Sequence, residues 1–272
     1  MGTKTVFVTG AAGGLGASTS RYLAERGWHV FAGDFDEVAL REIGKSPGIS
    51  PLVLDVTDPA SVEAARAVVA AACDGLDGVV NFAGILGVGS LVEVDAEAVR
   101  RVLDVNVMGT VRVNRALFPL VLARKGRIVN ISSETGWQSG MPFNGPYAMS
   151  KHAIEAYSDS LRRELMFLGV PVIKIQPGPF RTAMVAGIER SFTRATETST
   201  HFKAMLARIM HLAVKEQDKA HDPVQLAEVV HEALTSRSPR SAYSVKPDPG
   251  RVVLNLLPAR AADALLKRAL RS

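Results

Sequence analysis

Residues 5–16 read TVFVTGAAGGLG and decide the fold. The first five, Thr5 to Thr9, are uncharged and rich in β-branched and apolar side chains, which predicts a strand buried on both faces of a parallel sheet. Four glycines follow, before a helical stretch from Ala17 to Arg26. Such a turn presents unpaired backbone N–H groups and the positive end of a helix dipole, and it lets a pyrophosphate approach closely. The stretch therefore predicts a dinucleotide-binding unit.

The next strand indicates which dinucleotide binds. His29 to Ala32 reads as a second buried strand, and Asp34 follows at its carboxyl end, eighteen residues after Gly16. A carboxylate there can accept hydrogen bonds from the adenosine ribose and repels a 2′-phosphate. No Lys or Arg occurs between Gly10 and Leu15 or directly after Asp34, so we expect NAD rather than NADP. The alternative is that Asp34 is a turn or helix-capping residue, although Asp36 could fill that role instead.

A tyrosine and a lysine four residues apart indicate catalytic chemistry. Tyr147 and Lys151 lie in the run PYAMSK, residues 146–151, and on a helix they share one face. A nearby cation favours phenolate, so we expect the pKa of Tyr147 to fall below its ordinary value of about 10. Such a phenol can exchange a proton with a hydroxyl or carbonyl substrate. Alone, a pair of this kind is more often a solvated helix-surface contact, but here it accompanies a dinucleotide turn.

Together these motifs resemble those of the short-chain dehydrogenases/reductases. Residues 9–16 match the TGxxxGxG turn of that family, and Tyr147 with Lys151 matches its YxxxK helix. The match runs in family order from about Lys4 to Thr182, which makes it more specific than any single motif. The resemblance implies an NAD-dependent oxidoreductase whose cofactor is bound by Gly10, Gly14, Leu15, Gly16, Asp34, Asp55, Val56, Asn81, Ala83, Gly84, Tyr147, Lys151, Pro177, Gly178 and Thr182.

The segments between and beyond these motifs carry the rest of the resemblance. Asp55 and Val56 resemble the family's adenine-contacting residues after the third strand, and residues 81–84, NFAG, resemble its NNAG motif. Phe82 replaces the second Asn of that motif, which removes one side-chain hydrogen bond. Residues 177–182, PGPFRT, resemble the segment that holds the nicotinamide carboxamide.

The resemblance implies a catalytic set of Asn106, Ser133, Tyr147 and Lys151. The serine has two rivals, because the commonest family spacing before Tyr147 lands on Glu134 and because Ser132 is adjacent. Aligning the strand Arg127 to Ile131 favours Ser133, and an ionised carboxylate cannot donate a hydrogen bond to a carbonyl. Tyr147 would transfer the hydroxyl proton while NAD takes the hydride, and Ser133 would hold the substrate oxygen. Lys151 would also bind the nicotinamide ribose and pass protons to a water near Asn106.

Composition predicts one α/β domain. The chain has 272 residues, of which 47% are hydrophobic and 22% charged, and it shows no repeats. Alternating strands and helices, with helices at Pro59–Cys73, Ala96–Arg124 and Pro146–Leu168, predict a Rossmann-type, doubly wound parallel sheet with helices on both faces. We take residues 1–272 as a single dinucleotide-binding catalytic domain, with a substrate lid at 183–222 and a C-terminal helical extension at 246–272.

The last third bears on the substrate. Residues 183–210 mix methionines and phenylalanines with polar residues and could form two amphipathic helices over the crevice, although ordinary helix packing explains the pattern as well. The run AYSDSLRRE, residues 156–164, resembles the retinol and hydroxysteroid dehydrogenase branch of the family. That resemblance implies a lipophilic secondary alcohol or ketone, steroid-like or retinoid-like. A small polar alcohol, an acyl thioester, or a non-catalytic NAD-sensing role are the alternatives, and the direction of reaction stays open.

Other expectations concern partners. A net charge of +5 without a long basic run argues against nucleic acid, and no metal motif is recognisable among the six histidines. The first strand follows residue 4 directly, which leaves no room for a signal peptide, so we expect a cytoplasmic protein. The long helices predict a homo-oligomer. The basic amphipathic tail, residues 258–270, should cover the fold or a partner subunit, with contact to a membrane surface as the less favoured alternative.

Overall fold

The computed structural model describes residues 2–181, 184–216 and 220–271. Within them the strands form a seven-stranded, entirely parallel sheet in the order β3-β2-β1-β4-β5-β6-β7. The strands are β1 (Thr5–Thr9), β2 (His29–Asp34), β3 (Ile49–Val53), β4 (Gly78–Asn81), β5 (Arg127–Ile131), β6 (Val172–Pro177) and β7 (Ala242–Val245). The order reverses between β1 and β4, which confirms the predicted doubly wound sheet.

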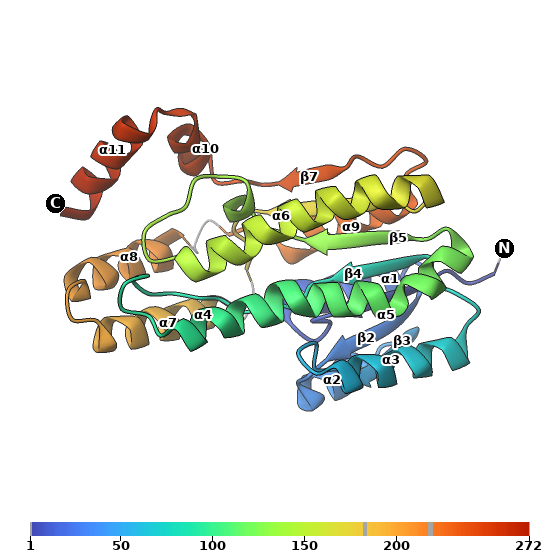
Figure 1. Cartoon of the computed structure of the whole chain (residues 1–272). Helices are drawn as coiled ribbons and strands as arrows, with labels where there is room; N and C mark the ends of the chain where they lie inside the picture. Colours follow the sequence, from blue (N-terminus) through green and yellow to red (C-terminus); the bar gives the residue numbers. More distant parts are fainter. Residues whose placement is uncertain (1, 182–183, 217–219, 272) are drawn as a thin grey trace.

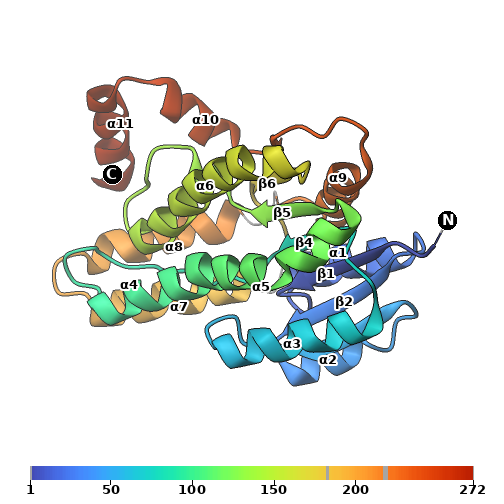
Figure 2. The same ribbon diagram turned by 45° about the vertical axis from the view of Figure 1, so that its right-hand side comes forward.

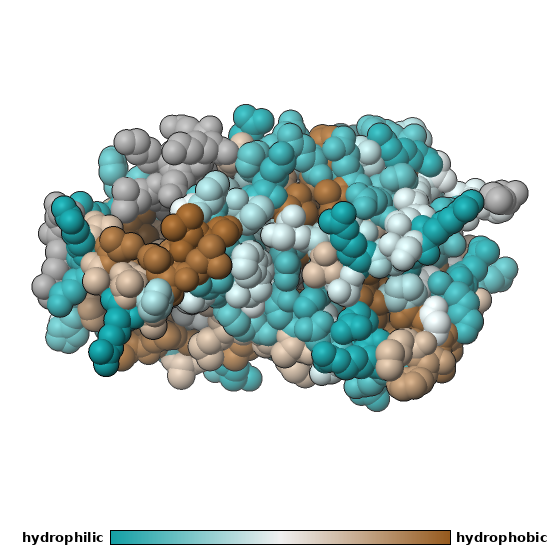
Figure 3. All heavy atoms as spheres, turned by 90° about the horizontal axis from the view of Figure 1, so that it is seen from above, coloured by the Kyte–Doolittle hydropathy of each residue, from teal (hydrophilic) through white to brown (hydrophobic). Residues whose placement is uncertain are grey.

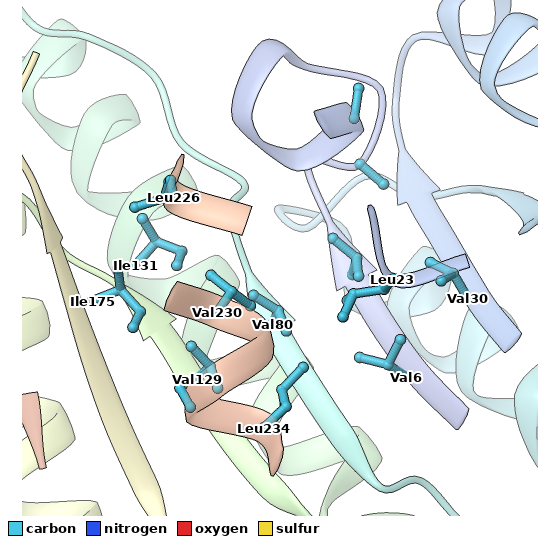
Figure 4. Close-up of a cluster of buried hydrophobic side chains, with 14 of the residues drawn as sticks. Val6, Leu23, Val30, Val80, Val129, Ile131, Ile175, Leu226, Val230 and Leu234 are labelled. Atoms are coloured by element: carbon cyan, nitrogen blue, oxygen red, sulfur yellow. The ribbon is translucent and has the colours of Figure 1, made fainter. Parts of the chain in front are cut away.

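Helices cover both faces of the sheet (Figures 1 and 2). One face carries α1 (Gly14–Ala24), α2 (Glu37–Ile43) and α9 (Pro223–Thr235). The other carries α3 (Pro59–Ala72), α5 (Gly109–Arg124) and α6 (Gly145–Leu165). Figure 4 shows the first interface, where Leu23 of α1 and Val230 of α9 meet valines of the strands. Each such fully buried side chain contributes roughly 1.5–3 kcal/mol to the stability of the fold. The two helix layers thereby hold the sheet in place, and in such sheets ligands bind at the carboxyl ends of the strands.

Two long helices differ from the sequence prediction. The stretch expected as one helix over 96–124 is α4 (Ala96–Leu103), a π-helical turn (Asp104–Met108) and α5. The helix expected over 146–168 ends at Leu165 and closes in a 3-10 turn (Met166–Leu168). The π turn holds Asn106, whose side chain bonds to the backbone of the loop after β4, and this outside contact favours the wider turn.

Further helices gather at the carboxyl ends of the strands (Figure 1). The lid region forms α7 (Met184–Thr198) and α8 (Lys203–Glu216), as the amphipathic pattern predicted. The tail forms α11 (Ala259–Arg271), which packs against α8, so the fold itself covers part of this helix. A short helix that the sequence did not predict, α10 (Pro249–Leu256), precedes it. In the described part of the chain, no helix is long and apolar enough to cross a membrane.

The surface of these helices and of α6 is only partly apolar. Figure 3 shows apolar side chains gathered at the end that carries α10 and α11, where Val253 and Leu256 are 60% and 79% exposed. On α6, by contrast, Ile154 and Leu165 are buried within the chain itself. These two residues therefore belong to the core.

Candidate active site

A cavity of about 680 Å³ opens at the carboxyl ends of the central strands, where the strand order reverses. Of the predicted site residues, those that line it are Gly10, Gly14, Leu15, Gly16, Asp34, Val56, Ala83, Gly84, Ser133, Tyr147, Lys151, Pro177 and Gly178. Asp55, Asn81 and Asn106 lie outside the described lining, and Thr182 lies outside the described residues. Residues scattered over some 170 positions thus share one crevice, as expected for an open α/β sheet.

The glycine turn has no room for side chains. Gly10 adopts a φ of +62°, and a Cβ there would stand 2.8 Å from the Ala83 nitrogen. A Cβ on Gly16 would overlap the Gly10 carbonyl oxygen. The first N–H groups of a helix have no intrahelical acceptor, and the N-cap residue of α1, Gly13, has no side chain to supply one. A tight, uncapped helix start beside a cavity fits a pyrophosphate group.

Asp34 has the turn contacts that the sequence offered as one alternative, and it also borders the cavity. One carboxylate oxygen accepts from the Ala12 N–H at 2.9 Å and the other from the Asp36 N–H at 3.1 Å, and the side chain borders the cavity. Asp36 is the N-cap of α2, where it accepts from two backbone N–H groups. Each Asp34 oxygen keeps a further lone pair for a ribose hydroxyl. Asp34 therefore holds the glycine turn as well as facing the space for the adenosine.

Two predicted cofactor residues make hydrogen bonds outside the described cavity lining. Asn81 is buried and donates to the side-chain oxygens of Asn114 and Asn130 at 2.8 and 2.9 Å. Asp55 is exposed and accepts from Thr57, while its neighbour Val56 lines the cavity. The sequence grouped these two residues with the cofactor site because they resemble family motifs, and in the structure both lie outside the described cavity lining.

Asn106 also lies behind the cavity wall. Its side-chain oxygen accepts from the Ile85 N–H at 2.7 Å, and its side-chain nitrogen donates to the Ile85 carbonyl and to the Ser150 hydroxyl at 3.0 and 2.9 Å. Ser150 precedes Lys151 on α6. Asn106 thus ties the loop after β4 to the helix that carries the tyrosine and the lysine.

The three candidates for the catalytic serine position point in different directions. Ser133 lines the cavity beside Tyr147, accepts from the Thr135 N–H at 3.1 Å and lowers the pKa of Tyr147. The Ser132 hydroxyl is sealed in the interior, against Gly136. Glu134 turns away, toward the start of α10, where it accepts from the Asp248 N–H at 2.7 Å. Among these three, the geometry favours Ser133 for substrate contact.

Burial governs the protonation of Tyr147 and Lys151. Burial raises the pKa of Tyr147 to about 12, against the lowering effects of the Ser133 hydrogen bond and of the Arg251 charge. Burial likewise lowers the pKa of Lys151 to about 8. The Lys151 ammonium donates to the Ile131 carbonyl at 2.9 Å and lies 5.5 Å from the centroid of the Tyr147 ring. The expectation of a lowered tyrosine pKa is therefore wrong here, because desolvation of a buried phenolate outweighs the nearby charges.

The apolar walls of the cavity come from its loops more than from the lid. Leu86, Val105 and Phe180 line it, whereas Phe192 is buried in helix packing and Phe202 packs edge-on against Phe143, with ring centroids 5.3 Å apart. The side chain of Met184 lies outside the description.

A single carboxylate secures the tip of the lid. Glu93 accepts from the Ser199 hydroxyl at 2.5 Å and from the N–H groups of Thr200 and His201 at 3.0 and 2.8 Å. These bonds lower the pKa of Glu93. Sequence reasoning missed this residue, and it also missed Arg251, because each acts on residues more than a hundred positions away.

Comparison with known proteins agrees with this geometry. The sequence profile of the family described as short chain dehydrogenase matches residues 4–192. The chain is 32% identical to human retinol dehydrogenase 5, over 96% of this chain and 87% of that protein. It is 35% identical to bovine 17-beta-hydroxysteroid dehydrogenase type 6, over 97% and 88%. Its fold is similar to a solved actinorhodin polyketide ketoreductase variant with NADPH, with a TM-score of 0.76, 27% identity and coverage of 89% and 95%.

Proposed function

Because this chain belongs to the short-chain dehydrogenase family, whose members bind nicotinamide dinucleotides, we propose that it is an NAD(H)-dependent oxidoreductase that interconverts a lipophilic secondary alcohol and its ketone. The observation that carries the proposal is one cavity lined by the glycine turn, Asp34, Ser133, Tyr147 and Lys151. These residues fit a dinucleotide with a substrate beside it. When bound, the nicotinamide would accept or supply the hydride.

The chain's own groups would manage the proton. With a pKa of about 12, Tyr147 is a phenol at neutral pH and is ready to donate a proton to a carbonyl oxygen. Ser133, which lines the cavity beside that phenol, can donate to the same substrate oxygen and stabilise its developing charge. Lys151 is held by the Ile131 carbonyl. At a pH below its pKa of about 8 it is protonated and places a cation close to the Tyr147 ring. In the direction of oxidation Tyr147 must lose its proton, so that direction should gain with rising pH.

Support for NAD over NADP comes from charge. Among the described residues of the cavity lining, Lys151 supplies the one cation, and it lies at the catalytic end. At the adenosine end the lining carries Asp34 and Asp36. A 2′-phosphate would meet negative charge and no guanidinium or ammonium partner. The solved relative that contains NADPH is a reason to measure this preference directly.

Support for a lipophilic substrate comes from the relatives' names, retinol and hydroxysteroid dehydrogenases, and from the apolar wall of Leu86, Val105 and Phe180. Burial of apolar surface contributes roughly 25 cal/mol per Å², so a multi-ring substrate would gain over a short alcohol. We further propose a cytoplasmic homo-oligomer without a nucleic-acid partner. Two exposed methionines, Met108 at the end of the π-helical turn before α5 (45%) and Met149 on α6 (46%), are candidates for the subunit contact.

The test is NADH absorbance at 340 nm with retinol, hydroxysteroids, sugar alcohols and the matching carbonyl compounds, each with both cofactors. Turnover of an apolar alcohol or ketone with NAD(H) is the expected result. Binding of NADH without turnover of any compound would contradict the proposal and would favour a sensing role.

A further inference from the structure

The C-terminal extension reaches the loop that carries the catalytic serine. After Ser133 the chain makes a 3-10 turn (Glu134–Gly136), and α10 lies against it. One Glu134 oxygen accepts from the N–H of Asp248, the N-cap of α10, at 2.7 Å. The other faces the Arg251 guanidinium at 3.4 Å. The Glu134 and Arg251 side chains are only 10% and 20% exposed.

Arg251 also holds the turn through a second residue. Its Nη1 donates to the Thr135 hydroxyl at 3.0 Å, and the Thr135 N–H donates to the Ser133 hydroxyl at 3.1 Å. Ser133 and Tyr147 border the same cavity, and Ser133 lowers the pKa of Tyr147. The turn has little freedom to shift, because a Cβ on Gly136 would stand 2.9 Å from the Lys151 carbonyl oxygen. A series of hydrogen bonds therefore links α10 to Ser133, beside Tyr147.

The same two charges act on the tyrosine with opposite signs. Apart from the dominant effect of burial and the Ser133 hydrogen bond, the charge of Arg251 lowers the pKa of Tyr147 and the charge of Glu134 raises it. Lys151 is the other charged group near the ring. Removal of the Arg251 charge should therefore raise the pKa of Tyr147, and removal of the Glu134 charge should lower it.

Stability alone does not explain a largely buried ion pair at this position. Desolvation of two charges offsets much of their attraction, and an apolar pair of similar volume is often as stable. Because this pair joins the turn after Ser133 to α10, it can instead hold the Ser133 loop in position.

We infer that Glu134 and Arg251 are positioning residues for the reaction, through which the C-terminal extension holds Ser133 and Tyr147 in place for proton transfer. The inference rests on the proposed function, since it concerns the proton step of that reaction. The extension is then part of the active site as well as a cover on the fold.

Four variants test the inference. Arg251→Met removes the hydrogen bond to Thr135 and a charge that lowers the pKa of Tyr147, so kcat for alcohol oxidation at pH 8 should fall. The rise of the oxidation rate with pH, which follows the loss of the Tyr147 proton, should move to higher pH. Glu134→Gln should move that rise to lower pH. The Kd for NADH should not change in either variant, because neither residue lines the cavity.

The double variant Glu134→Gln with Arg251→Met guards against a loss of folding, since it leaves no unpaired buried charge. It should melt near the parent temperature and still be slow, because the contact with Thr135 is gone. Arg260→Met is the matched control, an exposed arginine of the same extension that should leave kcat and the pH profile unchanged.

Parent-like kcat and pH profiles in the Arg251 single variant and in the double variant would overturn the inference, as would losses of kcat that only follow the loss of folded protein. Failure of the proposed function would look different. In that case the parent chain would show no turnover with any alcohol or ketone, whatever these variants do.

Discussion

The nucleotide half of the site and its lid half, which comprises the lid region and the C-terminal extension, are held by contacts of very different range. In the first, β1 and α1 place Gly10 to Gly16 within one short stretch, and Asp34 joins them across 22 positions through the Ala12 N–H. In the second, Glu93 holds Ser199 across 106 positions, and Glu134 holds Asp248 across 114. Local motifs therefore define the cofactor site, whereas the substrate site depends on how distant segments meet. The following changes should separate the two halves.

The largest effect is expected at Tyr147, where the halves meet. Tyr147→Phe deletes one hydroxyl and leaves the glycine turn untouched, so kcat should fall about 10²- to 10⁴-fold while NADH still binds. Stopped turnover together with an NADH Kd near the parent value, measured by fluorescence, is the expected pair of results. Substantial residual activity would remove Tyr147 from the role of acid and base.

Asp34 tests the nucleotide half. Asp34→Ala deletes the acceptor for the Ala12 N–H as well as the charge, so it should weaken NAD binding and narrow the preference for NAD over NADP. Asp34→Asn keeps one acceptor oxygen and removes the charge. It should therefore narrow the preference, by roughly tenfold, with a smaller loss of NAD affinity. The measurement is the ratio of kcat/KM with NAD to kcat/KM with NADP. An unchanged ratio in both variants would show that Asp34 does not set the cofactor preference.

Lys151 should lower the stability of the folded chain, while turnover should depend on it. Its pKa falls from 10.5 in the unfolded chain to about 8 in the folded one, so the buried ammonium costs stability below pH 8, and this cost fades as the pH rises from 8 to 10.5. Lys151→Met should therefore raise Tm at pH 7 by several degrees, and the gain should shrink by pH 10. Turnover should drop sharply. Lys203→Met, at an exposed position, is the control for melting, and a pH-independent difference in Tm would contradict the argument.

The smallest effect is expected at the tip of the lid. Glu93→Ala removes three hydrogen bonds that hold residues 199–201, so KM for a large apolar substrate should rise about two- to tenfold with the NADH Kd unchanged. Glu97→Ala, which breaks only an exposed ion pair with Arg100, is the control. If both variants behaved alike, the lid half would not depend on this carboxylate.

The sequence predicted more of the fold than of the site. Apolar strands, glycines and capping residues are local signals, so the sheet, its doubly wound order and the helix start at Asp222 could be read directly. The π turn at Asn106 could not, because contacts with Ile85 stabilise it from outside the segment. The start of α10 carries the same local signal as Asp222, an N-cap Asp248 followed by Pro249, but its contact with Glu134 is not a local signal. The direction of the Tyr147 pKa also escaped the sequence, since burial is a property of the folded chain.

The most direct test of the central claim is the ratio of kcat/KM for a hydroxysteroid to that for a sugar alcohol, measured with NAD, with Tyr147→Phe as the blank. The account predicts a ratio of at least about tenfold in favour of the steroid, since about 55 Å² of additional apolar burial already amounts to 1.4 kcal/mol. A ratio of one or below, or equal turnover in the Tyr147→Phe blank, would contradict it.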